Sequence, residues 1–270
     1  INLVKNLDKS LISPKIIAPI SINNYLKKLD DNLKTNVLKI NSHPKFTRKL
    51  SNFFNDKYFK LYCKVNKPDI IHSTYFKNTK IDNSKLVVTV YDLIYEIFQQ
   101  RFKLKISKEF KQKSLENADK IICISENTKK DLLKYYKLDE KKISVILLGR
   151  PESKNYNIIN DKFLDDPFIL YVGDRNKYKN FRSLLKAFFI SKKLSNDFNL
   201  VCFGSSPFSN DEIDYISDHN FDFKKIKFFS GDDKDLNYLY MKAELYVCPS
   251  MYEGFGLTIL EAMNLDCPII

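Results

Sequence analysis

Two carboxylates flank a glycine-containing turn near the end of the chain. Glu253 precedes Gly254-Phe255-Gly256, and Glu261 lies about two turns into the apolar-patterned helix that this turn opens. An ionised carboxylate only accepts hydrogen bonds, so the pair suits recognition of sugar or ribose hydroxyls. The glycines let main chain approach a ligand, and the helix N-terminus attracts an anion. Taken alone, the acids are better explained as one complementing the helix dipole and one solvated on the helix.

A second loop carries cations. The segment "GDRNKYKNF" follows an apolar run and brings Arg175, Lys177 and Lys179 to the start of the next helical pattern. Cations beside the free N–H groups of a helix N-terminus form a site for a phosphate or diphosphate. A solvated lysine-rich loop explains this segment alone about equally well. Together with the two acids in the same half of the chain, it favours a binding site.

A third turn, "GSSPF", follows the next apolar run. Gly204 would permit a close backbone approach there, although an ordinary turn is the favoured interpretation of this segment by itself.

The elements that position these loops alternate in type, as in βαβ units with a parallel sheet. In such sheets ligands bind outside the carboxyl ends of the strands, where the three loops follow. The predicted strands are 15–20, 37–40, 69–73, 86–91, 120–124, 143–147, 168–172, 199–203, 226–229 and 245–248. The predicted helices are 1–7, 46–65, 107–117, 127–136, 180–195, 211–217, 234–241 and 256–264.

The alternation lapses into polar, proline-containing sequence between 149 and 167. We therefore predict an N-terminal domain over 1–150, a linker over 151–166 and a C-terminal domain over 167–270. The final "CPII" is typical of the start of another buried strand, so the second sheet is expected to be incomplete.

Composition narrows the function classes. A hydrophobic content of 44% is ample for packed cores, and no apolar run approaches the roughly 20 residues that span a bilayer. The five cysteines are scattered without metal-like pairing, which favours buried free thiols in a reducing compartment. The net charge of +12 fits an acidic lipid surface or an anionic substrate. Nucleic-acid binding is disfavoured, because no recognition motif accompanies the lysines.

The quoted segments follow the order of landmarks in a known family. "EGFGLTILEAM" resembles the acid-x7-acid signature of retaining family 4 glycosyltransferases (glycosyltransferase group 1). "YVGDRNKYKNF", "LVCFGSSPF" and "ADKIICISENTKKDLL" resemble further landmarks, as do "DIIHSTYF" and "VVTVYDLIYE" in the first half. The likeness covers most of the chain. It is strongest to bacterial enzymes that build O-antigen or other surface polysaccharide, many of them mannosyltransferases.

This resemblance implies an α/β fold of the GT-B type, in which two Rossmann-like, doubly wound parallel-sheet domains face a cleft. The C-terminal domain would hold a nucleoside diphosphate sugar, with GDP-mannose as one candidate. Glu253 would bind donor-sugar hydroxyls and Glu261 the ribose, while Arg175 and Lys179 would neutralise the leaving diphosphate. The other donor-binding positions would be Gly173, Gly204, Gly254, Phe255, Gly256 and Leu257. The resemblance also implies that no metal is needed, for which the two cations offer a physical reason, and no cofactor is expected.

The N-terminal domain would hold a glycan or lipid-linked acceptor. Candidate acceptor-side residues are His72, Tyr91, Asp92 and Ser125. Many relatives have His where this chain has Tyr91, which leaves the role of that position open. Capping of the next segment explains Asp92 equally well, a structural role explains His72 equally well, and Ser125 is also the predicted N-cap of a helix.

The resemblance implies a cytoplasmic enzyme, peripheral at the inner membrane face, that transfers a hexose with retention of configuration. Relatives begin with an additional strand and continue beyond "CPII", so both domains are expected to be incomplete here. A catalytically degenerate sugar-nucleotide-binding protein and a GT-B epimerase remain as alternatives. A basic nucleic-acid binder would instead show a steep salt dependence of DNA affinity and indifference to sugar nucleotides.

Overall fold

The structure, a computed structural model, describes most of the chain. The described residues are 2–21, 26, 29, 31–35, 38–39, 47–76, 81–102, 107–149, 155–175, 177–204 and 206–270. Contacts divide the chain into two compact units, residues 1–71 with 79–86 and residues 72–78 with 87–270. Their boundary runs through the strands β3 (Ile70–Ser73) and β4 (Lys85–Val90). The domain limits at 150 and 167 stay a prediction.

The longest helix described in the first unit is α2 (Thr47–Asn66). Its other elements are α1 (Asn2–Lys5), β1 (Ile20–Ser21), the 3-10 turn η2 (Asp31–Leu33) and β2 (Leu38–Lys39), with β1 and β2 paired in parallel. Asn55 of α2 donates to the Ile20 carbonyl at 3.0 Å and accepts from the Ile20 N–H at 2.9 Å. One side-chain amide thus satisfies both backbone groups of a strand residue.

A parallel sheet with the strand order β3-β4-β5-β6 occupies the N-terminal half. Val88, Val90 and Ile121 on its strands are completely buried, which is where β-branched residues pack best. The remaining elements are α3 (Ile94–Phe102), α4 (Lys108–Glu116), β5 (Lys120–Cys123), α5 (Glu126–Tyr135), η3 (Glu140–Lys142) and β6 (Ile143–Val145).

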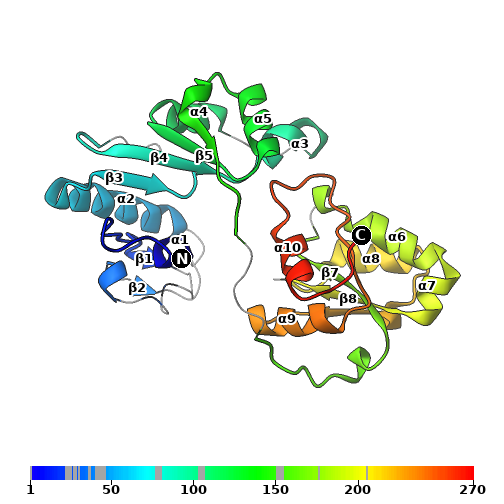
Figure 1. Ribbon diagram of the computed structural model, residues 1–270. Helices are drawn as coiled ribbons and strands as arrows, with labels where there is room; N and C mark the ends of the chain where they lie inside the picture. The colour runs from blue at the N-terminus through cyan, green and yellow to red at the C-terminus, as the bar shows by residue number, and fades with distance from the viewer. Residues whose placement is uncertain are drawn as a thin grey trace. The chain divides into compact units, whose positions relative to one another are not determined.

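The C-terminal half contains a second parallel sheet, with the order β10-β7-β8-β9 (Figure 1). Its strands are β7 (Phe168–Val172), β8 (Asn199–Phe203), β9 (Ile226–Phe229) and β10 (Leu245–Tyr246). Its helices are α6 (Phe181–Ile190), α7 (Lys192–Asp197), α8 (Asn210–Asp218), α9 (Asp233–Lys242) and α10 (Leu257–Asn264), and its 3-10 turns are η4 (Lys162–Leu164), η5 (Lys177–Lys179) and η6 (Phe223–Lys225).

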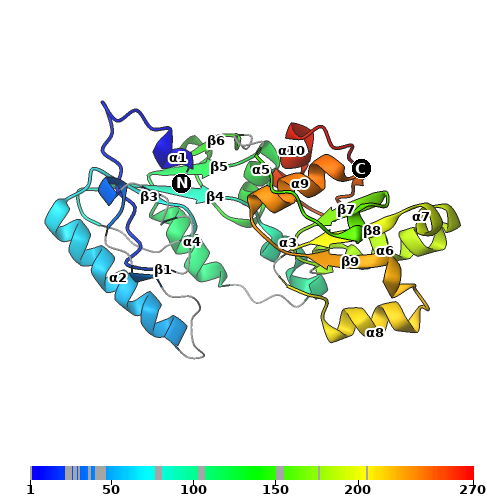
Figure 2. The ribbon, with the colours of Figure 1, turned by 90° about the horizontal axis from the view of Figure 1, so that it is seen from below.

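Both faces of this second sheet are covered. Phe168, Leu170 and Val172 of β7 pack with α9 and α10, while Ile169 and Tyr171 pack with α6 and α8. Figure 2 shows α9 and α10 on one side of the strands and α8 on the other. Because a strand buried on both faces needs apolar residues at every position, β7 reads as a continuous apolar run. The predicted α/β fold with parallel sheets in both halves is therefore confirmed.

The strand order places a topological switch point between β7 and β10. With β7 counted as the first strand, the order is 3-2-1-4, the Rossmann arrangement. The chain winds outward from β7 to β9 and then crosses back to pair β10 with the other edge of β7. Ligands of such sheets bind at this point, outside the carboxyl ends of the strands. The two loops that begin there are 173–180 and 247–256.

Several predicted elements differ from the structure. The strand predicted over 15–20 is limited to a bridge at Ile16 and the short β1, and α3 was not predicted. The helix predicted over 180–195 is two helices, because Ser191 adopts an extended conformation and caps α7. The predicted strand at "CPII" is present as one parallel bridge between Ile269 and Tyr246.

Candidate functional site

An ion pair joins the two loops that leave the switch point. Lys179 Nζ, from the loop after β7, lies 2.6 Å from Glu253 Oε1, from the loop after β10. Their side chains retain 18% and 24% exposure, so neither is sealed from solvent. Among the described residues this is the one hydrogen bond of the Lys179 ammonium, which can donate three. The structure therefore brings two of the predicted catalytic residues together and leaves the ammonium able to bind an additional anion.

A main-chain hydrogen bond also joins the loop that carries Lys179 to the loop that carries Glu253. The Met251 N–H donates to the Tyr178 carbonyl at 2.9 Å. The Tyr178 ring stacks on Phe98, with centroids 6.1 Å apart, and burial raises the pKa of its phenol to about 12. A rigid neutral residue thus holds the position next to Lys179.

The glycine turn fits tightly against the N-terminal half. A Cβ at Gly254 would lie 2.2 Å from the Tyr91 carbonyl, a separation that no side chain tolerates. The Gly254 carbonyl accepts from Ser125 Oγ at 2.7 Å and from Thr128 Oγ1 at 3.3 Å. Gly256 has a φ of 79°, a conformation that favours glycine. No side chain caps α10, so the first N–H groups of this helix can bind a ligand.

Glu261 lies in α10 with part of its carboxylate buried. Burial raises its pKa, Asp233 raises it further, and a hydrogen bond from Tyr240 opposes both. Tyr240 Oη lies 3.4 Å from Glu261 Oε2 and 3.1 Å from the Thr258 carbonyl, so its single proton is shared. In the described part of the chain the carboxylate has no further hydrogen bond, which leaves it free to accept one from a ligand hydroxyl.

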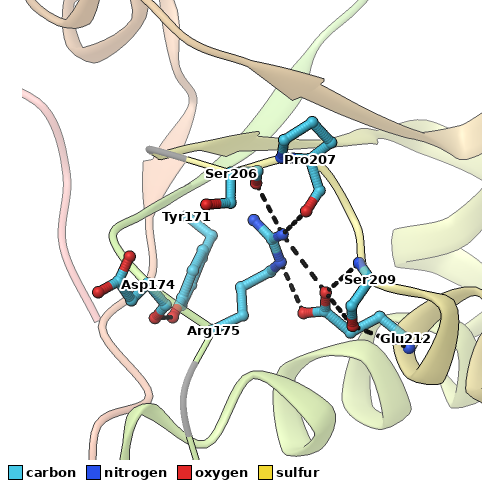
Figure 3. Close-up of polar contacts among 7 residues, drawn as sticks. All are labelled: Tyr171, Asp174, Arg175, Ser206, Pro207, Ser209 and Glu212. Carbon is cyan, nitrogen blue, oxygen red and sulfur yellow. Dashed lines mark hydrogen bonds and ion pairs between the residues drawn. The ribbon is translucent and has the colours of Figure 1, made fainter. Parts of the chain in front are cut away.

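The partners of Arg175 differ from those of Lys179. Its guanidinium binds Glu212 and the carbonyls of Ser206 and Pro207 (Figure 3). Gly173 and Gly204, predicted to approach the donor, approach each other: a Cβ on Gly204 would lie 2.9 Å from the Gly173 carbonyl. Phe255 is partly buried and Leu257 is 43% exposed at the start of α10.

The predicted acceptor-side residues have local partners. His72 Nε2 lies 2.7 Å from Thr89 Oγ1, and burial lowers the pKa of the imidazole. Asp92 Oδ1 accepts from the Ile94 N–H at 3.1 Å, the capping role considered above, and burial raises the pKa of Asp92. Burial also raises the pKa of Tyr91. Ser125 caps α5 as predicted and additionally holds the glycine turn.

Sequence reasoning missed a buried charged cluster near Asp92. Glu96 pairs with Lys111 at 2.7 Å and accepts from Tyr136 Oη at 2.5 Å. It also missed Glu212, which the capping-box spacing of Ser209 and Glu212 could have indicated. No group of three or more His, Cys, Asp or Glu side chains in the described residues could hold a metal ion, and none of the described helices is long and apolar enough to cross a membrane.

Two family models together match the whole chain. Residues 1–152 match the family model described as Glycosyltransferase Family 4, and residues 152–270 match Glycosyl transferases group 1. The O-antigen chain mannosyltransferase RfbU of Salmonella typhimurium is 29% identical over 187 residues, covering 68% of this chain and 50% of that protein. O-antigen chain mannosyltransferase B of Escherichia coli is 33% identical over 105 residues, 38% of this chain and 28% of that protein. The chain thus spans half or less of the length of these relatives.

Solved structures support the fold. Anabaena HepE, determined in complex with UDP and glucose, has a TM-score of 0.65 at 15% identity, covering 94% of this chain and 71% of that one. Sucrose-phosphate synthase from Thermosynechococcus elongatus has a TM-score of 0.64 at 22% identity, covering 87% and 62%. Both are glycosyltransferase-like in fold, as the resemblance predicts. Since the first family model spans more than half of the sequence, the chain belongs to Glycosyltransferase Family 4.

Proposed function

We propose that this chain belongs to a retaining hexosyltransferase that takes its sugar from a nucleoside diphosphate donor. The observation that carries the proposal is the Lys179–Glu253 pair at 2.6 Å. It unites a cation suited to a phosphate with a carboxylate suited to sugar hydroxyls, at the point of the sheet where nucleotides bind.

Each charged residue has a separate task in this proposal. Lys179 uses its remaining donors to bind the diphosphate and stabilises the negative charge that develops as the diphosphate leaves. Glu253 accepts hydrogen bonds from the donor sugar, and its contact with Lys179 orients its carboxylate. Glu261 accepts hydrogen bonds from the ribose. The acceptor hydroxyl attacks the face from which the diphosphate departs, and a phosphate oxygen takes the proton.

The glycine turn supplies uncharged contacts. The Ser125 and Thr128 hydroxyls donate hydrogen bonds to the Gly254 carbonyl. These bonds fix the turn, and with it the N–H groups at the start of α10, before the donor binds. A preorganised donor group stabilises developing charge without reorganising during the reaction. We therefore assign Ser125 to the support of this turn.

Mannose is the first donor sugar to test, because two relatives are named O-antigen chain mannosyltransferases. The acceptor in this proposal is a growing glycan, carried on a lipid at the inner membrane face. The net charge of +12 suits a peripheral position on acidic lipid. Sedimentation with anionic vesicles but not with zwitterionic vesicles would support this location, and sedimentation with neither would contradict it.

The proposed function is tested by a thermal-shift panel of GDP-, UDP- and ADP-sugars, followed by transfer of radiolabelled hexose to lipid-linked glycan. We expect one nucleotide class to stabilise the protein, since ligand binding to the native state raises its melting temperature. Binding without transfer would favour the degenerate alternative. Interconversion of the free donor sugar without transfer would favour the epimerase, and no stabilisation by any nucleotide would contradict the donor site.

A further inference from the structure

Arg175 has more polar partners than any other cation in the described C-terminal half. Its Nε donates to Glu212 Oε1 at 2.7 Å, and its Nη2 donates to the carbonyls of Ser206 and Pro207 at 2.9 and 2.7 Å. Nη2 also lies 3.4 Å from Glu212 Oε2. Figure 3 shows the guanidinium enclosed between these groups. The planar fork of arginine suits such a set of acceptors, which an ammonium could not span.

Aromatic rings close the remaining sides of the guanidinium. Its central carbon lies 4.6 Å from the Phe208 ring centroid, 5.5 Å from that of Phe228 and 5.8 Å from that of Phe181. The Arg175 side chain is only 6% exposed. A charge buried to this degree is stable only while its partners remain in place.

The carboxylate of Glu212 also has several hydrogen-bond partners in this cluster. Besides Arg175, it accepts from the Ser209 N–H at 2.7 Å and from Ser209 Oγ at 2.9 Å, as the capping box of α8. Burial acts to raise the pKa of Glu212, but the hydrogen bonds from Arg175 and Ser209 together outweigh it and lower the pKa. To reach a bound diphosphate, Arg175 would have to leave this carboxylate charged, buried and unpaired.

The contacts of Arg175 instead join the ends of two neighbouring strands. Arg175 lies just after β7, while Ser206, Pro207 and Glu212 lie between the end of β8 and the first turn of α8. The Gly173–Gly204 approach brings the same two strand ends together. Lys179 follows four residues after Arg175 in the same loop. The other end of this loop is held by the hydrogen bond from the Met251 N–H to the Tyr178 carbonyl.

We propose that Arg175 is a positioning residue for the donor site: it fixes the loops after β7 and β8 through Glu212 and the Ser206–Pro207 carbonyls, and it is not itself a ligand of the diphosphate. This inference rests on the proposed function. It replaces the direct role that the sequence suggested for Arg175.

The test compares two conservative variants by calorimetric titration with GDP and UDP and with the corresponding monophosphates. A direct ligand and a positioning residue predict opposite results for Glu212→Gln. If Arg175 acts through Glu212, Glu212→Gln and Arg175→Gln both weaken diphosphate binding, each by about tenfold, the factor that corresponds to 1.4 kcal/mol. Both variants then also weaken monophosphate binding, so the ratio of diphosphate to monophosphate affinity stays as in the wild type.

If Arg175 is a direct ligand, Glu212→Gln releases it and binding stays equal or tightens, while Arg175→Gln alone lowers that ratio. This result would overturn the inference, as would unchanged binding in both variants. Glu212→Gln decides the question even if Arg175→Gln fails to fold, since glutamine is also accepted at this position of a capping box.

Asp161→Asn is the matched control. Asp161 pairs with Lys227 at 2.7 Å, and Lys227 lies on β9, at the opposite edge of the sheet from β10. This variant is expected to leave nucleotide affinity unchanged; a loss equal to that of Glu212→Gln would show that any ion pair of the sheet has this effect and would overturn the inference. A wild type that binds no nucleotide would instead contradict the proposed function itself.

Discussion

Two cations of the loop after β7, Lys179 and Arg175, form ion pairs with different surroundings. Lys179–Glu253 and Arg175–Glu212 are nearly equal in length, at 2.6 and 2.7 Å. The first keeps about a fifth of each side chain exposed and leaves the ammonium with unused donors. The second is enclosed by aromatic rings and main-chain carbonyls. A cation in a loop after a strand is therefore no sign of a ligand site until its partners are known.

The largest contrast between the pairs concerns stability. Arg175→Gln leaves Glu212 buried without its cation, and removing one partner of a buried pair costs about 3–5 kcal/mol. Lys179→Gln breaks a partly exposed pair, which contributes about 0–1 kcal/mol. Urea unfolding of the two variants measures both values. Equal losses would show that burial does not distinguish the pairs.

The next effect acts on the position of Glu253. Gly254→Ala forces the turn away from the Tyr91 carbonyl and so displaces the carboxylate from Lys179. We expect a loss of about 100-fold in kcat/KM for the donor, the scale of a misplacement of about 1 Å. The Arg175 pair is untouched by this change.

Gly149→Ala provides the control for Gly254→Ala, because a Cβ at Gly149 meets nothing within 4 Å. The Gly149 variant should transfer hexose at the wild-type rate. Full activity in the Gly254 variant would mean that the turn is not held against residue 91 during turnover.

The smallest effect is a gain in stability at a site residue. The pKa of Glu261 is raised above 4.5, so the folded state binds its proton more tightly than the unfolded state. Wild-type stability therefore falls as the pH rises from 4.5 through the raised pKa. Glu261→Gln removes this loss and should be more stable than the wild type at about pH 8, with no difference below the unfolded pKa.

Chemical unfolding at several pH values checks this prediction for Glu261. The same variant should bind the donor more weakly, because the amide replaces a charged acceptor of the ribose hydroxyls. A variant that is less stable at every pH would show that the carboxylate is not strained by burial.

Much of the second sheet could be predicted from its sequence. The runs at 168–172 and 199–203 are apolar at every position because helices cover both faces, and they emerge as β7 and β8 with those bounds. The turn at 254–256 was identified by its glycines, and Gly256 does adopt positive φ. In these places the sequence pattern of the segment itself is enough to predict the element.

Where the prediction fell short, the decisive partner lies far away in sequence. Arg175 and Lys179 look alike in "GDRNKYKNF", and only Glu212, 37 residues further on, separates their environments. The break at Ser191, by contrast, has a local cause: the serine hydroxyl accepts from the Leu194 N–H and begins a new helix. Gly173 and Gly204 were predicted to approach the donor, which stays a prediction; the structure adds that they lie close to each other.

One measurement tests the donor site most directly: calorimetric titration of GDP-mannose and the UDP- and ADP-sugars into wild type, Lys179→Met and Lys227→Met. The two variants remove the same charge from two ion pairs of one sheet. We expect one donor to bind the wild type, Lys179→Met to bind it about tenfold or more weakly, as loss of a charge-assisted hydrogen bond predicts, and Lys227→Met to bind it equally well. Wild-type affinity in Lys179→Met would contradict the assignment of the diphosphate to Lys179.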